Sequence, residues 1–321
     1  MSKQEKYAVG VDLGGTNIKV GIVSEAGETV AKASVATLAE EGPNVVISQI
    51  KKGISEVLAD KTFDIKGIGI GSPGVVSIDK GIVENPPNLP GWGKIMLGDI
   101  LEKEFNIKVV VENDANAAAI GELVFGAGKE FDSFVMITLG TGVGGGIILN
   151  KKIYRGDFGA AGEIGHITID YKGNKCNCGN YGCIETYIGN NYLIKWVSEE
   201  LANTSYDSKI MELVDNDLDR LTPKIISDAA DLKDEYAHSV ISKMGLYLGA
   251  ALASVSNILD VSTYVIGGGV SGLGEPLIKA IENGIKDRVL KSLSSRVKVV
   301  PAMLRNDAGV KGASSLVFYN Y

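Results

Sequence analysis

The chain has 321 residues, of which 45% are hydrophobic, and this length can supply two globular lobes with cores of their own. Its formal net charge of −7 and the lack of a basic stripe argue against a nucleic-acid partner. No cleavable apolar segment precedes Tyr7, and polar residues interrupt the most apolar helical stretch, 244–259, so we expect a cytoplasmic protein with no membrane partner.

A glycine turn joins two predicted strands near the N-terminus. Residues 7–12 have the pattern of a buried strand, and a second strand over 18–23 and a third near 29–35 follow the turn. Backbone N–H groups and the threonine hydroxyl of such a turn can bind phosphate oxygens. Asp12, which ends the first strand, either holds Mg²⁺ through water beside those phosphates or caps the turn.

A strand over 107–111 precedes an alanine-rich helix that begins near Asp114. A carboxylate at this position commonly caps a helix or stabilises its first turn. Glu112, Asn113 and Asn116 crowd the same segment. This surplus of polar groups favours a site in which the carboxylate accepts a proton from a substrate hydroxyl as it attacks a phosphorus. On the residues alone, both interpretations stay open.

The strand and glycine-turn arrangement recurs later in the chain. A strand over 134–139 is followed by the turn Gly140-Thr141-Gly142 and by strands over 146–149 and 152–154. Such an internal repeat indicates two related α/β lobes. Each lobe would offer one glycine and threonine hairpin to phosphate groups.

All three cysteines, Cys176, Cys178 and Cys183, fall within eight residues, and one of the two histidines, His166, lies upstream. One histidine and three cysteines form a complete tetrahedral ligand set for zinc, which leaves no open position and so predicts a structural metal. The alternatives are three buried thiols, or a disulfide with one thiol spare.

A third glycine loop, 267–272, follows a predicted strand over 263–266 and precedes a helix with Pro276 in its first turn, which suits a nucleoside or sugar ring. The loop matches the G-x-G-x-x-G pattern of dinucleotide-binding proteins. A dehydrogenase is nevertheless disfavoured, because the next strand lacks the acidic residue that holds a ribose. No Walker-type loop occurs in the sequence, so a nucleotide site must use the hairpin turns.

Two predicted helices, over 186–203 and 236–259, are interpreted as scaffold. The second contains a series of small residues, namely Gly245, Gly249, Ala250, Ala251 and Ala253. Small side chains permit close helix packing, either within the chain or across a dimer seam.

Seven motifs in chain order resemble those of the ROK sugar kinases, and they span nearly the whole chain. They are VDLGGTNIK from Val11, GSPG from Gly71, NPPNLPGW from Asn85, ENDANA from Glu112, GTGVGG from Gly140, GEIGH from Gly162 and the knuckle CNCGNYGC from Cys176. The resemblance implies an α/β, two-lobed, actin-like (ribonuclease-H-like) ATPase fold with a structural zinc knuckle. We place the smaller lobe at residues 1–112, joined by a C-terminal helix at 305–321, and the larger lobe at 113–304.

The resemblance also implies site residues and partners. Asp114 matches the catalytic base of the family. The sugar contacts that the resemblance implies are Gly74, Asn88, Asn113, Asp114, Glu163, His166 and Glu185. The implied nucleotide and phosphate contacts are Asp12, Gly14, Gly15, Thr16, Lys19, Gly140, Thr141, Gly142, Gly267, Gly268 and Gly269. Zinc would bind His166, Cys176, Cys178 and Cys183, Mg²⁺ would accompany ATP, and the assembly would be a homodimer or homotetramer.

The predicted function is ATP-dependent phosphorylation of the 6-hydroxyl of glucose, because ENPPNLPGW and CNCGNYGCIET resemble bacterial glucokinases. An N-acetylhexosamine, mannose or fructose kinase is an alternative, since pocket shape around the 2-hydroxyl decides sugar choice. A non-catalytic sugar sensor is a second alternative. ROK repressors place a helix-turn-helix domain before the sugar-binding body, which we do not expect here because the first strand starts at Tyr7.

Overall fold

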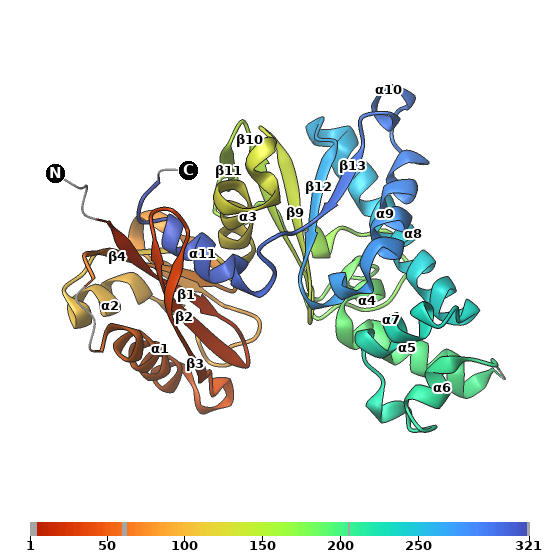
Figure 1. Cartoon of the computed structure of the whole chain (residues 1–321), viewed down its shortest axis with the longest axis horizontal. Coiled ribbons are helices and arrows are strands. Elements are labelled where there is room, and N and C mark those ends of the chain that lie inside the picture. Colours follow the sequence, from red (N-terminus) through yellow and green to blue (C-terminus); the bar gives the residue numbers. More distant parts are fainter. Residues whose placement is uncertain (1–4, 60–62, 205, 320–321) are drawn as a thin grey trace. The chain divides into compact units, whose positions relative to one another are not determined.

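The computed structural model describes residues 5–59, 63–204 and 206–319. Its contacts divide the chain into two units (Figure 1). Unit 1 comprises Met1–Ser133, Gly146–Gly162 and Met303–Tyr321, and unit 2 comprises Phe134–Gly145 and Glu163–Ala302. This division differs from the boundary expected after Glu112, because the helix that follows Glu112 packs on the C-terminal helix within unit 1.

Unit 1 is built on a five-stranded sheet in the order β3-β2-β1-β4-β8, with a small sheet β5-β6-β7 beside it. Its elements are β1 (Tyr7–Leu13), β2 (Asn17–Ser24), β3 (Thr29–Ala36), η1 (Ala39–Glu41), α1 (Pro43–Leu58), β4 (Ile65–Ser72), β5 (Val75–Ser77), η2 (Ile78–Lys80), β6 (Ile82–Glu84), β7 (Lys94–Ile95), α2 (Leu97–Phe105), β8 (Val109–Asn113), α3 (Asp114–Phe125), η3 (Ala127–Glu130), β11 (Lys152–Tyr154), η7 (Arg305–Asp307) and α11 (Ala308–Ser315). β10 (Val143–Leu149) spans the division between the units and pairs antiparallel with β11.

The pairing register aligns polar residues at one end of the unit 1 sheet. β1, β4 and β8 are parallel, and Asp12 pairs with Gly71, which pairs with Glu112. In parallel α/β sheets, ligands bind beyond the carboxyl ends of the strands. The carboxyl ends of these three strands therefore define the region where a site is expected.

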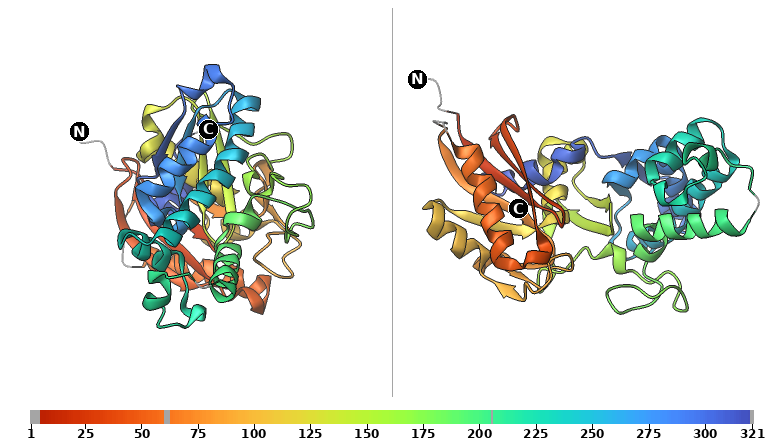
Figure 2. Two further views of the ribbon diagram at one scale, coloured as in Figure 1. Left: turned by 90° about the vertical axis from the view of Figure 1, so that its right-hand side faces the viewer. Right: turned by 90° about the horizontal axis from the view of Figure 1, so that it is seen from below.

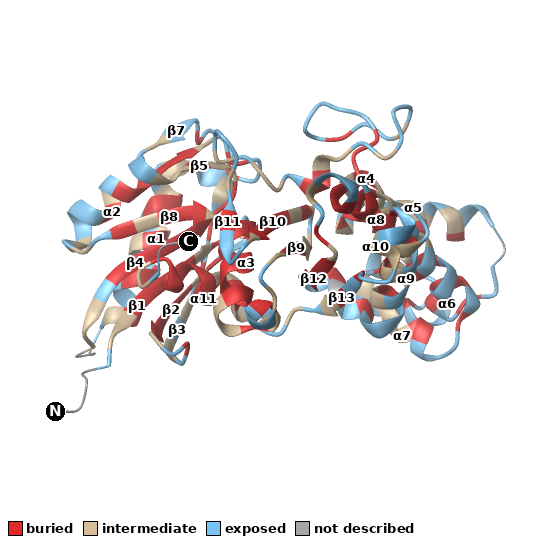
Figure 3. Ribbon diagram, turned by 90° about the horizontal axis from the view of Figure 1, so that it is seen from above, coloured by how far each residue is buried: buried red, intermediate tan, exposed pale blue. Residues whose placement is uncertain are grey.

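The two faces of this sheet pack differently. Alternate residues such as Val9 and Val11 join a buried apolar core with α1 and α2. Figure 3 shows the buried stretches of these strands in red. The opposite face contacts α11 through glycines, and a Cβ on Gly10 would lie 2.0 Å from the carbonyl oxygen of Val310. α11 also packs closely on α3, since a Cβ on Gly312 would lie 1.7 Å from the carbonyl oxygen of Ala117.

The buried carboxylate of Glu122 fixes the C-terminal segment within unit 1. It accepts hydrogen bonds from the backbone N–H groups of Ala127 at 2.7 Å, Met303 at 3.2 Å and Leu304 at 2.8 Å. Because this side chain is fully buried, these three donors compensate for the loss of its hydration.

Unit 2 combines parallel strands with most of the helices of the chain (Figure 2). β12 pairs in parallel with both β9 and β13. The elements are β9 (Phe134–Leu139), η4 (Ile164–His166), α4 (Glu185–Ile188), α5 (Asn190–Asn203), α6 (Lys209–Leu213), η5 (Leu218–Arg220), α7 (Pro223–Asp231), α8 (Glu235–Leu259), β12 (Thr263–Gly267), η6 (Gly269–Leu273), α9 (Gly274–Lys286), α10 (Lys291–Ser294) and β13 (Lys298–Pro301). The helix expected over 186–203 is thus two helices, separated at Gly189.

The small residues of α8 serve packing within the chain. A Cβ on Gly245 would lie 2.3 Å from Cβ of Ala280, and one on Gly249 would lie 2.6 Å from Gly284, both on α9. Among the described residues, α8 is also the one helix whose length and composition would allow a membrane span. Since 61% of its apolar window is buried in the protein, α8 is a core helix.

Candidate functional site

The first glycine hairpin connects β1 to β2 in unit 1. The N–H of Gly14 donates to the carbonyl oxygen of Asn17 at 3.1 Å, which closes the turn. The hydroxyl of Thr37, a fully buried side chain, donates to the carbonyl oxygen of Gly14 at 2.6 Å. Gly15, Thr16 and Asn17 are exposed at the tip, where their N–H groups can meet an anion.

Asp12 and Lys19 face each other across the base of this hairpin, because they are register partners on β1 and β2. Burial raises the pKa of the Asp12 carboxyl, and the charge of Lys19 partly opposes that shift. The carboxylate also lies against the start of α11, where a Cβ on Gly309 would be 2.5 Å from Cγ of Asp12. Asp12 is therefore held close to backbone and to a cation, and a bound metal ion would favour its ionised form.

Asn113, and not Asp114, caps α3. The side-chain oxygen of Asn113 accepts the N–H groups of Ala115 at 3.0 Å and Asn116 at 3.1 Å. Asp114 is the first residue of the helix, and its Oδ1 accepts the N–H of Ala115 at 2.8 Å. Of the two structural roles considered for Asp114, the first-turn position is therefore the one observed.

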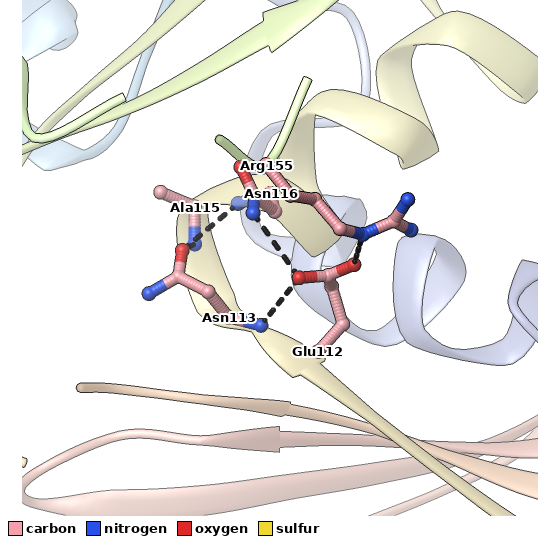
Figure 4. A network of polar contacts seen from close by, with 5 residues as sticks. All are labelled: Glu112, Asn113, Ala115, Asn116 and Arg155. Atoms are coloured by element: carbon pink, nitrogen blue, oxygen red, sulfur yellow. Dashed lines mark hydrogen bonds and ion pairs between the residues drawn. The ribbon is translucent and has the colours of Figure 1, made fainter. Parts of the chain in front are cut away.

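Behind this turn, Glu112 gathers three donors (Figure 4). Oε1 accepts the N–H of Asn113 at 2.9 Å and Nδ2 of Asn116 at 3.1 Å, while Oε2 accepts Nε of Arg155 at 2.8 Å. Glu112 is 2% exposed, so these three partners replace the water that would otherwise solvate its carboxylate. Arg155 was not predicted as a partner of Glu112, because it follows β11 and no local motif links the two residues.

Gly74 brings a second loop to the same end of the sheet. Its φ is +88°, and a Cβ there would lie 2.8 Å from Cα of Pro86, so both conformation and space require glycine. The carbonyl oxygen of Gly74 accepts Nδ2 of Asn113 at 3.2 Å. Farther along the loop, Asn88 lies against the first glycine hairpin, since a Cβ on Gly15 would be 3.2 Å from Cβ of Asn88.

In unit 2, Glu185 fixes the second glycine hairpin. The N–H of Gly140 donates to the carbonyl oxygen of Gly142 at 2.9 Å, and the N–H of Val143 donates to Oε2 of Glu185 at 3.0 Å. The third glycine loop lies beside this hairpin. Gly268 has a φ of +89°, and a Cβ there would lie 2.3 Å from the carbonyl oxygen of Leu139.

The three cysteines and His166 converge in unit 2. Their ligand atoms all lie within 4.8 Å of one another. Sγ of Cys178 is 3.6 Å from Sγ of Cys183, and Sγ of Cys176 is 3.8 Å from Nδ1 of His166. These separations fit a tetrahedral zinc site, whose sulfur–sulfur edge is about 3.8 Å for bonds of about 2.3 Å. None of the three cysteines forms a disulfide, so the disulfide alternative is wrong.

The thiols of Cys176 and Cys183 are buried, and Glu163 and Glu185 lie next to the cluster. Burial raises the pKa of Cys176, and burial with thiol hydrogen bonds raises the pKa of Cys183 to about 12, so a cation would be needed to hold the thiolates. Nε2 of His166 is 3.9 Å from Oε2 of Glu163. Sγ of Cys176 is 4.0 Å from Oε1 of Glu185.

Comparison with known proteins places these features in a family, because the model of the ROK family matches residues 8–319. The chain belongs to the ROK family. It is 38% identical to a glucokinase of Halalkalibacterium halodurans, over 98% of this chain and 95% of that protein. It is 29% identical to the xylose repressor of Bacillus subtilis, over 100% of this chain and 79% of that protein.

A solved structure of the same family is also closely similar. The crystal structure of a ROK family glucokinase from Streptomyces griseus in complex with glucose and AMPPNP has a TM-score of 0.86, 35% identity and coverage of 97% of this chain and 98% of that one. The predicted family is thus confirmed, and the chain has the actin-like ATPase fold of ROK proteins, with α/β sheets.

Within this ROK chain the predicted site residues form two groups, one in each unit. Unit 1 contains Asp12, Gly14, Gly15, Thr16, Lys19, Gly74, Asn88, Asn113 and Asp114. Unit 2 contains Gly140, Thr141, Gly142, Glu163, His166, Cys176, Cys178, Cys183, Glu185, Gly267, Gly268 and Gly269.

Proposed function

We propose that the protein is an ATP-dependent hexokinase that transfers the γ-phosphoryl group to the 6-hydroxyl of glucose. The observation that supports this most is the location of Asp114 at the same end of the unit 1 sheet as Asp12 and its glycine hairpin. A carboxylate base and a phosphate-binding turn are the parts that phosphoryl transfer requires. The similarity to glucokinases over nearly their whole length supports glucose as the sugar.

Asp114 is the proposed general base. It takes the proton of the sugar hydroxyl as that oxygen attacks the γ-phosphorus, the bond to the β-phosphate oxygen breaks, and ADP leaves. Because Asn113 caps α3, the capping role does not fall on the Asp114 carboxylate. The hydrogen bond from Ala115 N–H then orients this carboxylate at the helix start.

Sugar recognition is proposed to use side-chain amides, carboxylates, an imidazole and one glycine turn. In unit 1 these are Asn88, Asn113 and the Gly74 turn, which the Asn113–Gly74 hydrogen bond holds together. In unit 2 they are Glu163, His166 and Glu185. Carboxylates, amides and an imidazole offer the donors and acceptors that several hydroxyls of one hexose require.

The glycine hairpins are proposed to bind the phosphates and the third glycine loop the nucleoside. Gly14, Gly15, Thr16 and Lys19 form the first phosphate site, Gly140, Thr141 and Gly142 the second, and Gly267, Gly268 and Gly269 the adenosine site. Asp12 would hold Mg²⁺ through water, and the ion would neutralise charge on the phosphates. The closeness of Gly268 to the second hairpin supports this assignment.

We also propose a structural zinc at His166, Cys176, Cys178 and Cys183. Zinc on Nδ1 of His166 would fix Nε2 as a donor toward the sugar side, where Glu163 also lies. These four protein ligands would hold the loop in place and would complete a tetrahedral set, with no position left for water. We further propose a cytoplasmic enzyme, assembled as a homodimer or homotetramer, that supplies glucose 6-phosphate to glycolysis.

A sugar-sensing protein without catalysis is the second candidate function, and the similarity to a xylose repressor favours it. The two functions differ in what they require. A sensor needs the sugar contacts alone, whereas a kinase also needs Asp12, both hairpins and Asp114. Other sugars of the same reaction, such as N-acetylhexosamines, mannose and fructose, remain alternatives within the kinase proposal.

The test is Mg-ATP-dependent ADP release with glucose, mannose, fructose, xylose, N-acetylglucosamine and N-acetylmannosamine. We expect the highest kcat/KM with glucose. The Asp114→Asn variant should lose about 10²–10⁴-fold in kcat and retain glucose binding by calorimetry, as expected for loss of a general base.

Asp99→Asn is the matched control, because Asp99 is an exposed carboxylate in the first turn of α2. Its kcat should equal that of the wild type. Wild-type turnover by Asp114→Asn would remove Asp114 as the base. Sugar binding without ADP release by the wild type, for every sugar, would favour the sensor.

A further inference from the structure

The buried ion pair of Glu112 and Arg155 lies directly behind the turn that presents Asp114. We call residues 113–116 the α3 turn. Glu112 joins its two ends, because Oε1 accepts both the N–H of Asn113 and Nδ2 of Asn116. Oε2 is then directed away from these groups and accepts Nε of Arg155 (Figure 4).

Arg155 ties the α3 turn to a separate part of unit 1. It follows β11, while Glu112 belongs to β8, so the pair connects two segments that are distant in the sequence. A carboxylate that is 2% exposed requires a compensating charge, and Arg155 supplies it at 2.8 Å. Without that charge, the carboxylate would have to draw in water or reorient, and the Asn113 and Asn116 contacts would change with it.

The side chain of Arg155 is partly accessible. Arg155 is 25% exposed and lines a cavity of about 960 Å³ in unit 1 together with Lys108, Asp157 and Phe158. A small solute can therefore reach the position of the guanidinium. This access makes a chemical replacement of the side chain feasible.

We propose that Glu112 and Arg155 are positioning residues that set the orientation of Asp114 for proton transfer. The inference rests on the proposed kinase function, since it concerns the geometry of the proposed base. Displacement of a catalytic group by about 1 Å can cost about 10²-fold in rate, so a pair that fixes the α3 turn can govern kcat without touching substrate.

The test removes the guanidinium and then returns it. Arg155→Ala is expected to lower kcat by about 10- to 100-fold, with the KM for ATP within threefold of wild type. Guanidinium chloride at a few tens of millimolar should restore kcat at least fivefold, and NaCl at equal ionic strength should not. Rescue of kcat by the missing group is a result that a purely structural loss would not give.

A second variant guards against misfolding caused by the stranded carboxylate. Glu112→Gln with Arg155→Ala leaves no buried charge in the pair. If the two residues act as one unit, the double variant should lose no more activity than Arg155→Ala alone. Additive losses would overturn the pairing.

Lys94→Ala is the matched control. It removes the cation of an exposed pair with Glu84, which lines the same cavity. Exposed pairs contribute little, so kcat should stay within twofold of wild type and guanidinium should have no effect. Arg155→Ala with wild-type kcat per folded molecule, whatever its melting temperature, would overturn the proposal.

Hydrogen exchange separates this inference from the kinase proposal. The N–H groups of Ala115 and Asn116 should exchange faster in Arg155→Ala and slow again with guanidinium. If the wild type phosphorylates no sugar, the kinase proposal fails, while this readout still tests whether the pair orders the α3 turn. Unchanged exchange would overturn the positioning role in either case.

Discussion

The carboxyl group of Asp12 is half-buried between β1 and the start of α11, and burial raises its pKa. A carboxyl with a raised folded-state pKa binds its proton more tightly in the folded protein than in the unfolded chain. Stability contributed by that proton is present at low pH and is lost as the pH rises from the ordinary value of 3.8 through the folded pKa. At neutral pH, ionised Asp12 therefore destabilises the protein when no metal is bound.

Asp12→Asn should consequently increase the free energy of unfolding at pH 7.5, and this gain should shrink as the pH falls toward 4. Urea titrations at several pH values measure it. The same variant should lose at least about 10-fold in kcat if Asp12 holds Mg²⁺. Asp207→Asn, which neutralises an exposed carboxylate of unit 2, is the control and should show neither effect. A pH-independent difference between Asp12→Asn and wild type would contradict the assigned burial effect.

At the scale of elements, α3 and α11 approach so closely that their contact depends on glycine. A Cβ on Gly312 would fall 1.7 Å from the carbonyl oxygen of Ala117, so the helices would have to separate. Gly312→Ala should therefore lower the free energy of unfolding by about 1–3 kcal/mol or more. It should also reduce kcat, because α3 begins at Asp114.

Gly272→Ala is the matched control, since nothing lies within 4 Å of a Cβ there. Its stability should change by less than about 0.5 kcal/mol. Equal denaturant midpoints for the two variants would mean that α11 tolerates displacement from α3.

The same helix pair shows where sequence reasoning succeeds and where it stops. The strands around Gly14 and Gly140 were predictable because alternating apolar residues and glycine turns are local signals. The boundary after Glu112 was not, because the faces by which α3 packs on α11 consist of alanine and glycine, which give little periodic signal. The Glu112–Arg155 pair was also missed, since only the fold joins residues from β8 and the end of β11.

At the scale of the whole molecule, the chain passes between the two units four times, yet the cysteine cluster lies entirely in unit 2. Zinc binding to such a ligand set is coupled to folding, because the thiols must be brought together by the fold and must lose their protons. The raised pKa values of Cys176 and Cys183 mean that protons compete with zinc, so zinc affinity should weaken as the pH falls.

Zinc removal should therefore destabilise unit 2 selectively. With 1,10-phenanthroline, hydrogen exchange should accelerate across residues 163–189, while β1 and β4 in unit 1 stay protected; added zinc should reverse the change.

Cys178→Ser should lose zinc by metal analysis and weaken glucose affinity, because the loop that contains His166 is no longer fixed. Asn177→Ser alters the exposed residue between two ligands and should retain both. Full zinc occupancy in Cys178→Ser would exclude this ligand set, and equal destabilisation of the two units would show that they unfold as one body.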